Sequence, residues 1–254
     1  MIYFLLLAFL PLFSEQYIVF LVEARKLDVS CNKALIRTIA KHPSDGSKNS
    51  DVGHAWIYIY DNGHVIEGGH SGETGTCQPR YLEGVHALVE AGDPNPIRYL
   101  FSEQNDGYFE CGSGGHRPTY AARMDLTEDQ LNQIKHLLKS YPFHRYSLTD
   151  RSCCHLIEHI GFLLNLSLDT SVTIKVEPFY KGMPFWSDAC YSTFTFGSPD
   201  KLQCELKKLV ASGIAQDVTC EFRKTCPSCA LIKGIRELPL LPKRTARYIG
   251  TLLN

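Results

Sequence analysis

Alternating polar and apolar positions predict a β-hairpin across residues 54–68. The first run is HAWIYIY, the second is HVIEG, and an Asn62-Gly63 turn joins them. Aromatic and β-branched runs on either side of Asn-Gly are the strongest short-range signal for a hairpin. With residues 62 and 63 in the turn, Tyr58 faces Glu67, and even-numbered residues of the first strand share a face with odd-numbered residues of the second. We therefore expect His54 and Glu67 on one face of a sheet, on neighbouring rungs.

Later segments show the 3.6-residue period of amphipathic helices. The predicted helices span about 127–139, 152–164 and 198–213. Thr127 and Gln130 form a capping box, Pro199 suits a first helical turn, and Gly213 is a stop signal. A short helix is also expected around 32–41, with strands near 97–101 and 119–124. Strands followed by helices in this order indicate an α+β fold with an antiparallel sheet.

The amino end resembles a secretory leader. Residues 2–13 and 17–22 are apolar, and a small residue, Ala24, precedes a basic pair. Pro11 and the polar residues 14–16 interrupt the roughly 18–20 apolar residues that a membrane span needs. We expect a signal peptide over residues 1–24, cleaved after Ala24, and hence a secreted, periplasmic or lumenal protein.

Composition narrows the class of protein. The chain has 254 residues, 44% of them hydrophobic and 21% charged, with a formal net charge of −1. These values exclude a disordered or coiled-coil chain, and the charge gives no sign of a nucleic-acid partner. Ten cysteines lie beyond residue 24. In an oxidising compartment most should form disulfides, and we expect a domain over 25–198 with a Cys-rich extension over 199–254. Zinc binding by Cys204, Cys220, Cys226 and Cys229 is the weaker alternative for this tail.

One thiol is placed for chemistry. Cys153 begins the second predicted helix, on the apolar face shared by Leu156, Ile157 and Ile160. The N–H groups of a first helical turn lower the pKa of a thiol and can stabilise an oxyanion. A thiolate nucleophile also needs an imidazole and a group that orients it, which His54 and Glu67 could supply. The neighbouring Cys154 is the alternative nucleophile.

These motifs resemble a known enzyme family. His-x-Trp-Ile-x-Ile-Tyr, the Asn-Gly turn and Val-Ile-Glu-Gly, followed much later by Tyr-x-Leu-x-x-x-Ser-Cys-Cys-His-Leu, are similar to the circularly permuted papain-like thiol enzymes. That branch of the NlpC/P60 superfamily includes the YiiX-like hydrolases and the lecithin:retinol acyltransferase group. The His strand precedes the Cys helix in this branch, as it does here. Ser152 stands where many members have asparagine.

The resemblance implies a fold and a site. It implies an antiparallel sheet packed on the nucleophile helix, with Cys153 as nucleophile, His54 as base and Glu67 as the orienting residue. It matches Tyr146, otherwise a core aromatic residue, to a tyrosine near the nucleophile. Independently of the resemblance, the Gly-rich loop at 68–75, which begins with Gly68 and Gly69, is either a substrate wall or a simple turn. The implied reaction is hydrolysis or acyl transfer at a peptide, a cell-wall amide or a lipid acyl group, with no cofactor.

Two other functions fit parts of the sequence. His155-Leu-Ile-Glu158-His159 matches the H-x-x-E-H pattern of some zinc peptidases, although no second motif supplies a third ligand. A disulfide-bonded binding module that keeps the fold without activity is the other alternative.

Overall fold

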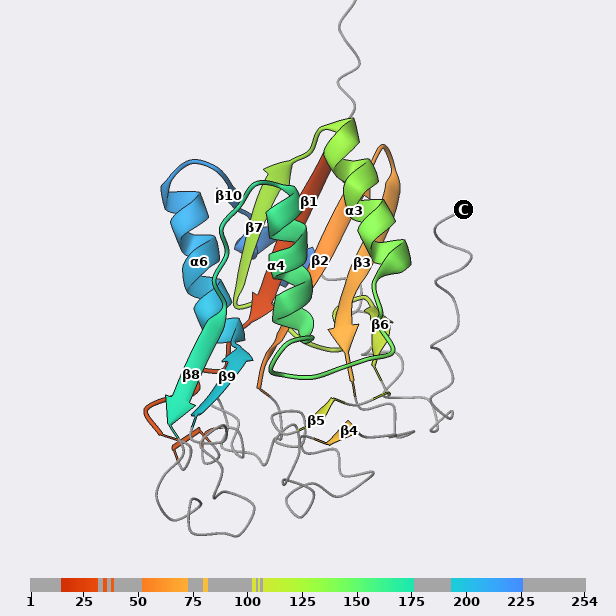
Figure 1. Cartoon of the computed structure of the whole chain (residues 1–254). Helices are drawn as coiled ribbons and strands as arrows, with labels where there is room; N and C mark the ends of the chain where they lie inside the picture. Colours follow the sequence, from red (N-terminus) through yellow and green to blue (C-terminus); the bar gives the residue numbers. More distant parts are fainter. Residues whose placement is uncertain are drawn as a thin grey trace, which may run out of the picture.

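The computed structural model describes residues 15–31, 34–35, 38, 52–72, 80–81, 102–103, 105, 107–175 and 193–225. The fold is mixed α/β, with a mostly antiparallel sheet and few helices (Figure 1). Its strands are β1 Gln16–Glu23, β2 His54–Asp61, β3 His64–Ser71, β4 Arg80–Tyr81, β5 Ser102–Glu103, β6 Tyr108–Cys111, β7 Tyr120–Asp125, β8 Ser171–Lys175, β9 Thr193–Gly197 and β10 Gln216–Asp217. Its helices are α3 Glu128–Ser140, α4 Cys153–Leu163, α6 Pro199–Ala211 and α7 Thr219–Thr225.

The predicted hairpin lies inside a six-stranded sheet of order β10-β7-β1-β2-β3-β6. All five pairings in this sheet are antiparallel. Tyr58 faces Glu67, as predicted, and Asn62 and Gly63 both have positive φ, at 47° and 96°. Two positive φ values are what a two-residue type I′ turn requires, which is why Asn-Gly fits here. The hairpin and its register are therefore confirmed.

The second apolar run of the predicted leader is a central strand. Strand β1 pairs with β2 on one side and with β7 on the other, and its residues 18–22 are fully buried. Cleavage after Ala24 would remove this strand from the middle of the sheet, so the predicted cut is incompatible with this fold. A strand buried on both faces reads as a continuous apolar run, and so does the core of a leader. Residues 1–14 lie outside the described part of the chain.

Helices α3, α4 and α6 lie on one face of the sheet (Figure 1). Their apolar side chains share one core with alternate residues of β1 and β2, namely Ile18, Phe20, Val22, Ala55, Ile57 and Ile59. The Thr127 capping box of α3 is present, and Ser198 caps α6 with Pro199 in the first turn, both as predicted. On the opposite face a smaller cluster of Val19, Leu21 and Trp56 packs against Phe222 of α7.

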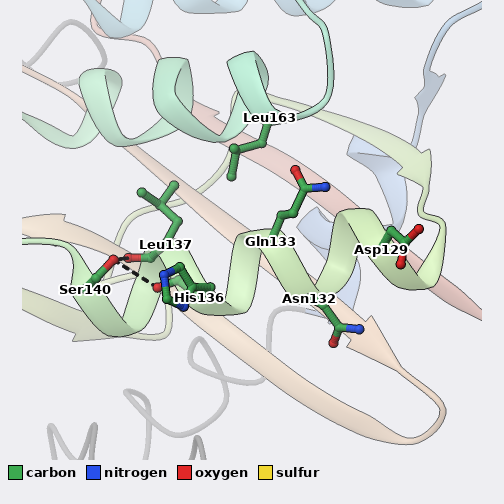
Figure 2. A pocket seen from close by; sticks show the side chains of 7 residues that line it. All are labelled: Asp129, Asn132, Gln133, His136, Leu137, Ser140 and Leu163. Carbon is green, nitrogen blue, oxygen red and sulfur yellow. Dashed lines mark hydrogen bonds between the residues drawn. The ribbon is translucent and has the colours of Figure 1, made fainter.

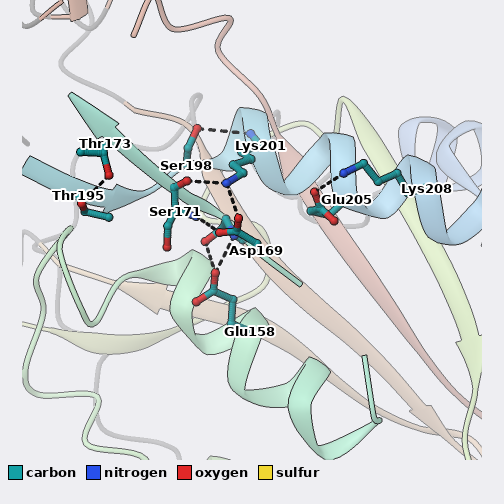
Figure 3. A network of polar contacts seen from close by, with 10 residues as sticks. Glu158, Asp169, Ser171, Thr173, Thr195, Ser198, Lys201, Glu205 and Lys208 are labelled. Carbon is teal, nitrogen blue, oxygen red and sulfur yellow. Dashed lines mark hydrogen bonds and ion pairs between the residues drawn. The ribbon is translucent and has the colours of Figure 1, made fainter. Parts of the chain in front are cut away.

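Residues after 198 belong to the same core. Leu202 and Leu206 of α6 are fully buried in it, and β10 extends the sheet beside β7. Figure 3 shows the polar network that joins α4, β8 and α6. The Glu158 carboxylate accepts from the Thr170 amide and hydroxyl at 2.7 and 2.6 Å, while Lys201 donates to Asp169 at 2.6 Å. The division predicted at residue 198 is thus corrected, because residues 199–225 complete the domain.

The remaining predictions of secondary structure fall partly outside the described residues. The strand predicted at 97–101 lies there, and of the predicted helix at 32–41 only residues 34, 35 and 38 are described, all helical. No helix in the described ranges is both long and apolar enough to cross a membrane.

Candidate active site

Three chain segments meet at one end of the sheet. Strand β1 ends at Glu23, β2 begins directly opposite at His54, and helix α4 begins nearby at Cys153 (Figure 1). Cys153 and His54 are almost completely buried, with 2% and 4% of their surface exposed. The His54 side chain and the Ala55 backbone amide both hydrogen bond with the Cys153 thiol. The structure therefore brings the predicted nucleophile and base into direct contact.

These contacts favour the ionised form of the Cys153 thiol. A hydrogen bond from Cys154 is the largest contribution that lowers the pKa of Cys153, and the hydrogen bond and charge of His54 add to it. Burial opposes this effect but does not outweigh it, so the pKa lies well below that of an ordinary cysteine. The position at a helix N-terminus acts in the same direction. The surroundings of Cys153 thus favour the thiolate over the thiol.

Cys154 has the opposite character. Burial raises its pKa well above the usual value, and its hydrogen bond with Cys153 raises the pKa further. A Cβ at Gly197 would approach the Cys154 Cβ to 2.9 Å, so this side chain packs tightly against the end of β9. Cys154 therefore stays a thiol and donates to its neighbour, which favours Cys153 as the nucleophile.

The first turn of α4 is held from within. The Ser152 amide donates to His155 Nδ1 at 3.1 Å, and the Ser152 hydroxyl lies 2.8 Å from the same nitrogen. Because Nδ1 accepts from an amide, His155 is neutral there, and burial lowers its pKa accordingly. Ser152 thus fixes the backbone around Cys153.

Ion pairs fix the segment that leads to α4. Arg145 makes two hydrogen bonds with the Glu103 carboxylate, at 2.7 and 2.6 Å, and Arg151 makes a third at 2.7 Å. The Glu103 side chain is only 13% exposed, so water screens these contacts less than it would at an open surface. Strand β5 thereby anchors the chain on both sides of the turn that precedes Cys153.

The side chains of the H-x-x-E-H motif on α4 make contacts within the fold. His155 serves the first turn, Glu158 binds Thr170, and His159 packs edge-on against Tyr141 at 5.7 Å between ring centroids. In the part of the chain that the structure describes, no three His, Cys, Asp or Glu side chains are grouped to share a metal ion.

Glu67 is not next to His54. It lies on the same face, as predicted, but continuing the β2–β3 register places Ser71 opposite His54, four residues beyond Glu67. Four residues of strand span about 13 Å. Among the described residues the Glu67 carboxylate hydrogen bonds with the Trp56 indole, at 3.3 Å, and not with His54. Burial raises the pKa of Glu67. The prediction that Glu67 and His54 share a face of the sheet is confirmed, but the prediction that they lie on neighbouring rungs is wrong.

Two aromatic rings lie nearly parallel to His54. The Trp56 ring is 5.8 Å away with an interplanar angle of 13°, and the His116 ring is 4.7 Å away at 28°. His116 Nδ1 is 2.5 Å from Glu23 Oε2. Glu67 therefore contacts Trp56, whereas Glu23 faces His54 across the strands and also binds the stacked His116.

The loop after β6 places His116 over His54. Gly112, Gly114 and Gly115 all have positive φ, between 61° and 88°, a conformation that glycine adopts without strain. The His116 amide donates to the Ser113 carbonyl at 3.0 Å and closes the turn. Sequence reasoning missed both partners, because Glu23 was assigned to the leader and His116 lay in a Gly-rich stretch without periodicity. The motif Cys-Gly-Ser-Gly-Gly-His was the available signal.

The residues predicted to contact substrate are packed within the fold. Gly68 and Gly69 belong to strand β3 rather than to a loop, which corrects that interpretation. A Cβ at Gly68 would approach the Glu110 carbonyl oxygen to 2.4 Å. Tyr146 is buried, with its ring edge-on to His70 at 4.9 Å. These contacts favour a role in packing for all three.

Replacing Gly69 by alanine should displace the base. The new Cβ would lie 2.7 Å from the Ala55 carbonyl oxygen and 2.8 Å from His54 Nε2, both too close for carbon. We expect a loss of about 1–3 kcal/mol in unfolding free energy and a higher pH midpoint of thiolate formation at Cys153. Gly63→Ala, in the turn of the same hairpin with no atom within 4 Å, should change stability alone. An unchanged midpoint in Gly69→Ala would contradict the expectation.

His70 makes stability depend on pH. Its Nε2–H donates to the Phe143 carbonyl at 2.9 Å, and burial lowers its pKa from 6.5 to about 3. The unfolded chain therefore binds a proton that the folded chain does not, so stability is lost as pH falls from about 6.5 towards 3, by about 1.4 kcal/mol per pH unit. His70→Leu should remove this one-proton slope from denaturation curves measured across that range. An identical slope in wild type and variant would refute it.

The described cysteines form no disulfide. Cys31, Cys111, Cys153, Cys154, Cys204 and Cys220 are all free. Cys77, Cys190, Cys226 and Cys229 lie outside the described residues. The disulfides expected from composition are therefore not found within the described part of the domain.

A hollow of about 510 Å³ lies between α3 and α4 (Figure 2). It is lined by Asp129, Asn132, Gln133, His136, Leu137, Ser140 and Leu163. Leu163 is the last residue of α4 and Cys153 the first, so Leu163 lies about 15 Å along the helix from Cys153. Its lining does not include Cys153, His54, Glu23 or His116.

Comparison of the chain with protein families, with curated proteins and with solved structures found no match.

Proposed function

We propose that this protein is a thiol hydrolase or acyltransferase of the circularly permuted papain-like type. The observation that carries the proposal is the contact of buried Cys153, at the N-terminus of α4, with His54 at the start of a strand that precedes the helix in the chain. A lowered thiol pKa beside an imidazole is the hallmark of an activated cysteine nucleophile. The order of strand and helix supports the permuted type.

The geometry supports a two-step reaction. His54 accepts the Cys153 proton, and the thiolate attacks the carbonyl carbon of an amide or ester. The negative charge on the carbonyl oxygen is stabilised by the Cys153 backbone N–H at the helix N-terminus. The His54 imidazolium then protonates the leaving group, which departs and leaves an acyl group on sulfur. Water or another acceptor, deprotonated by His54, releases the acyl group. No cofactor takes part.

The substrate class follows from this chemistry and from the resemblance. Peptides, cell-wall amides and lipid acyl esters all carry the required carbonyl. A secreted, periplasmic or lumenal site of action remains part of the proposal. Residues 16–23 must stay in the mature protein, because they form β1.

Acyl-enzyme trapping tests the function. The full chain is mixed with small acyl donors, namely a nitrophenyl ester, a thioester and a peptide amide, and is followed by intact-protein mass spectrometry. We expect a mass increase of one acyl group, mapped to Cys153. The exposed thiols Cys111, Cys204 and Cys220 are controls within the same chain. Acylation confined to those thiols, or none at all, would overturn the proposal in favour of an inactive binding module.

A further inference from the structure

Two polar side chains close to His54 come from β1 and from the loop after β6. Glu23 and His54 are register partners in neighbouring antiparallel strands, so their side chains leave the sheet on the same face. His116 binds Glu23 through Nδ1 and lays its ring beside that of His54. A carboxylate and a second imidazole are thus assembled beside His54, whose side chain contacts the Cys153 thiol.

The side chains around His54 differ in how far they are exposed to solvent. Cys153 and His54 are 2% and 4% exposed, whereas Glu23 and His116 are 17% and 22% exposed. A carboxylate at this depth is only partly screened by water, so its charge acts on His54, its register partner. Glu67, about 13 Å along β3 and bound to Trp56, is poorly placed for this role.

The other charged and titratable groups near His54 do not replace Glu23. Arg25 NH1 is 3.8 Å from Glu23 Oε1 and lies on the same segment as Glu23. His70 interacts electrostatically with His54, but its own lowered pKa keeps it neutral above about pH 3. Cys153 supplies the negative charge on the α4 side. Glu23 is thus the carboxylate that both faces His54 and holds the stacked ring.

We propose that Glu23 and His116 are positioning residues that stabilise the imidazolium form of His54 in its ion pair with Cys153. This proposal rests on the proposed function of the same site. A carboxylate only accepts hydrogen bonds, so His116 Nδ1 carries the proton between them. The Glu23 carboxylate is the negative charge that faces His54, and the Arg25 guanidinium offsets part of it; the remaining negative charge favours a positive His54 and therefore a negative Cys153. The Trp56 ring, stacked on His54 at 5.8 Å between ring centroids, adds an attraction for a cation.

Thiolate titration tests this role. The ultraviolet absorbance of the thiolate is followed against pH in the full chain, below the range in which tyrosines ionise, and the Cys153→Ser spectrum is subtracted. A direct spectrum is needed because Cys153 is buried and an alkylating reagent would also report access. We expect Glu23→Gln to raise the midpoint by about one pH unit, because it removes the charge but keeps the shape of the side chain. His116→Phe, which keeps a ring but removes the Nδ1–H that donates to the Glu23 carboxylate, should also raise it.

Matched variants separate charge from packing. Glu67→Gln makes the same change of carboxylate to amide on the same face, and its amide oxygen can still accept from Trp56, so the midpoint should move much less. Glu23→Asp keeps the carboxylate, so the pH midpoint of thiolate formation should stay low, close to that of the wild type. Thermal unfolding of each variant checks that the sheet is intact.

The two proposals fail differently. A normal, high midpoint in the wild type would overturn the activated thiol and, with it, this role. A low wild-type midpoint that Glu23→Gln leaves in place would overturn only the role of Glu23 and His116. A larger shift in Glu67→Gln than in Glu23→Gln would return the role to Glu67.

Discussion

Replacing Cys153 by serine is expected to abolish acyl-enzyme formation, with turnover of an ester or amide reduced by at least about 10³-fold. Serine has the shape of cysteine, but its hydroxyl is not ionised near neutral pH, and the contacts that lower the thiol pKa cannot offset that difference. The measurements are steady-state turnover and intact-protein mass with the same acyl donor. Because the serine side chain could still pack at the helix terminus, the unfolding temperature should change little.

Cys154→Ser is the matched control for this expectation. The serine hydroxyl can still donate to the Cys153 sulfur, so acylation at Cys153 should persist, with turnover within about tenfold of the wild type. Cys154→Ala, which has no donor, should raise the pH midpoint of thiolate formation. If Cys154→Ser were inactive while Cys153→Ser kept its turnover, the nucleophile would be Cys154 and the assignment of Cys153 would be reversed.

A chain that starts at Arg25 is expected not to fold. It lacks β1, whose residues 18–22 are five apolar side chains with 0–1% exposure. Burial of one such side chain stabilises a fold by about 1.5–3 kcal/mol, so the five contribute about 10 kcal/mol, comparable with the whole net stability of a domain. The truncation also removes Glu23. Circular dichroism and chemical denaturation of the purified chain measure the outcome.

A chain that starts at Ser14 is the matched comparison, because it keeps β1 from Gln16 onwards. We expect a cooperative unfolding transition for this chain and none for the chain that starts at Arg25. Cooperative unfolding of both would show that β1 is dispensable and would make cleavage after Ala24 compatible with the fold.

Local signals predicted the hairpin and the helices well because their determinants lie within a few residues of one another. The Asn62-Gly63 turn, the Thr127 capping box and Ser198-Pro199 each specify backbone geometry directly. Cys153 and His54, which are in contact in the structure, were also predicted as partners from their local sequence. The pairing of strands that are far apart in the sequence was not predicted. Nothing near Glu23 in the sequence indicates that β2 and β7 flank β1.

The error at Glu67 has a different origin. Face and rung are separate properties of a strand residue: a period of two sets the face, while the distance from the turn sets the rung. Both the face and the rung could be counted from the Tyr58–Glu67 pairing. This register places Ser71 opposite His54, and Glu67 is four residues before Ser71 on the same strand. The position of His116 could not be predicted in this way. The glycines between β6 and His116 have positive φ angles, and no periodic pattern in the sequence indicates them.

The central place of β1 also governs when the protein can become reactive. Val22 pairs with Tyr120 and lies one residue before Glu23, so the strand edge that carries Glu23 is completed only by a segment almost a hundred residues later. Pairing over such separations is slow, because the chain between the partners must be ordered first. Until that sheet closes, Cys153 lacks its contacts with His54 and Ala55 and behaves as an ordinary thiol. The nascent chain is therefore expected to acquire its nucleophile last, as a product of complete folding.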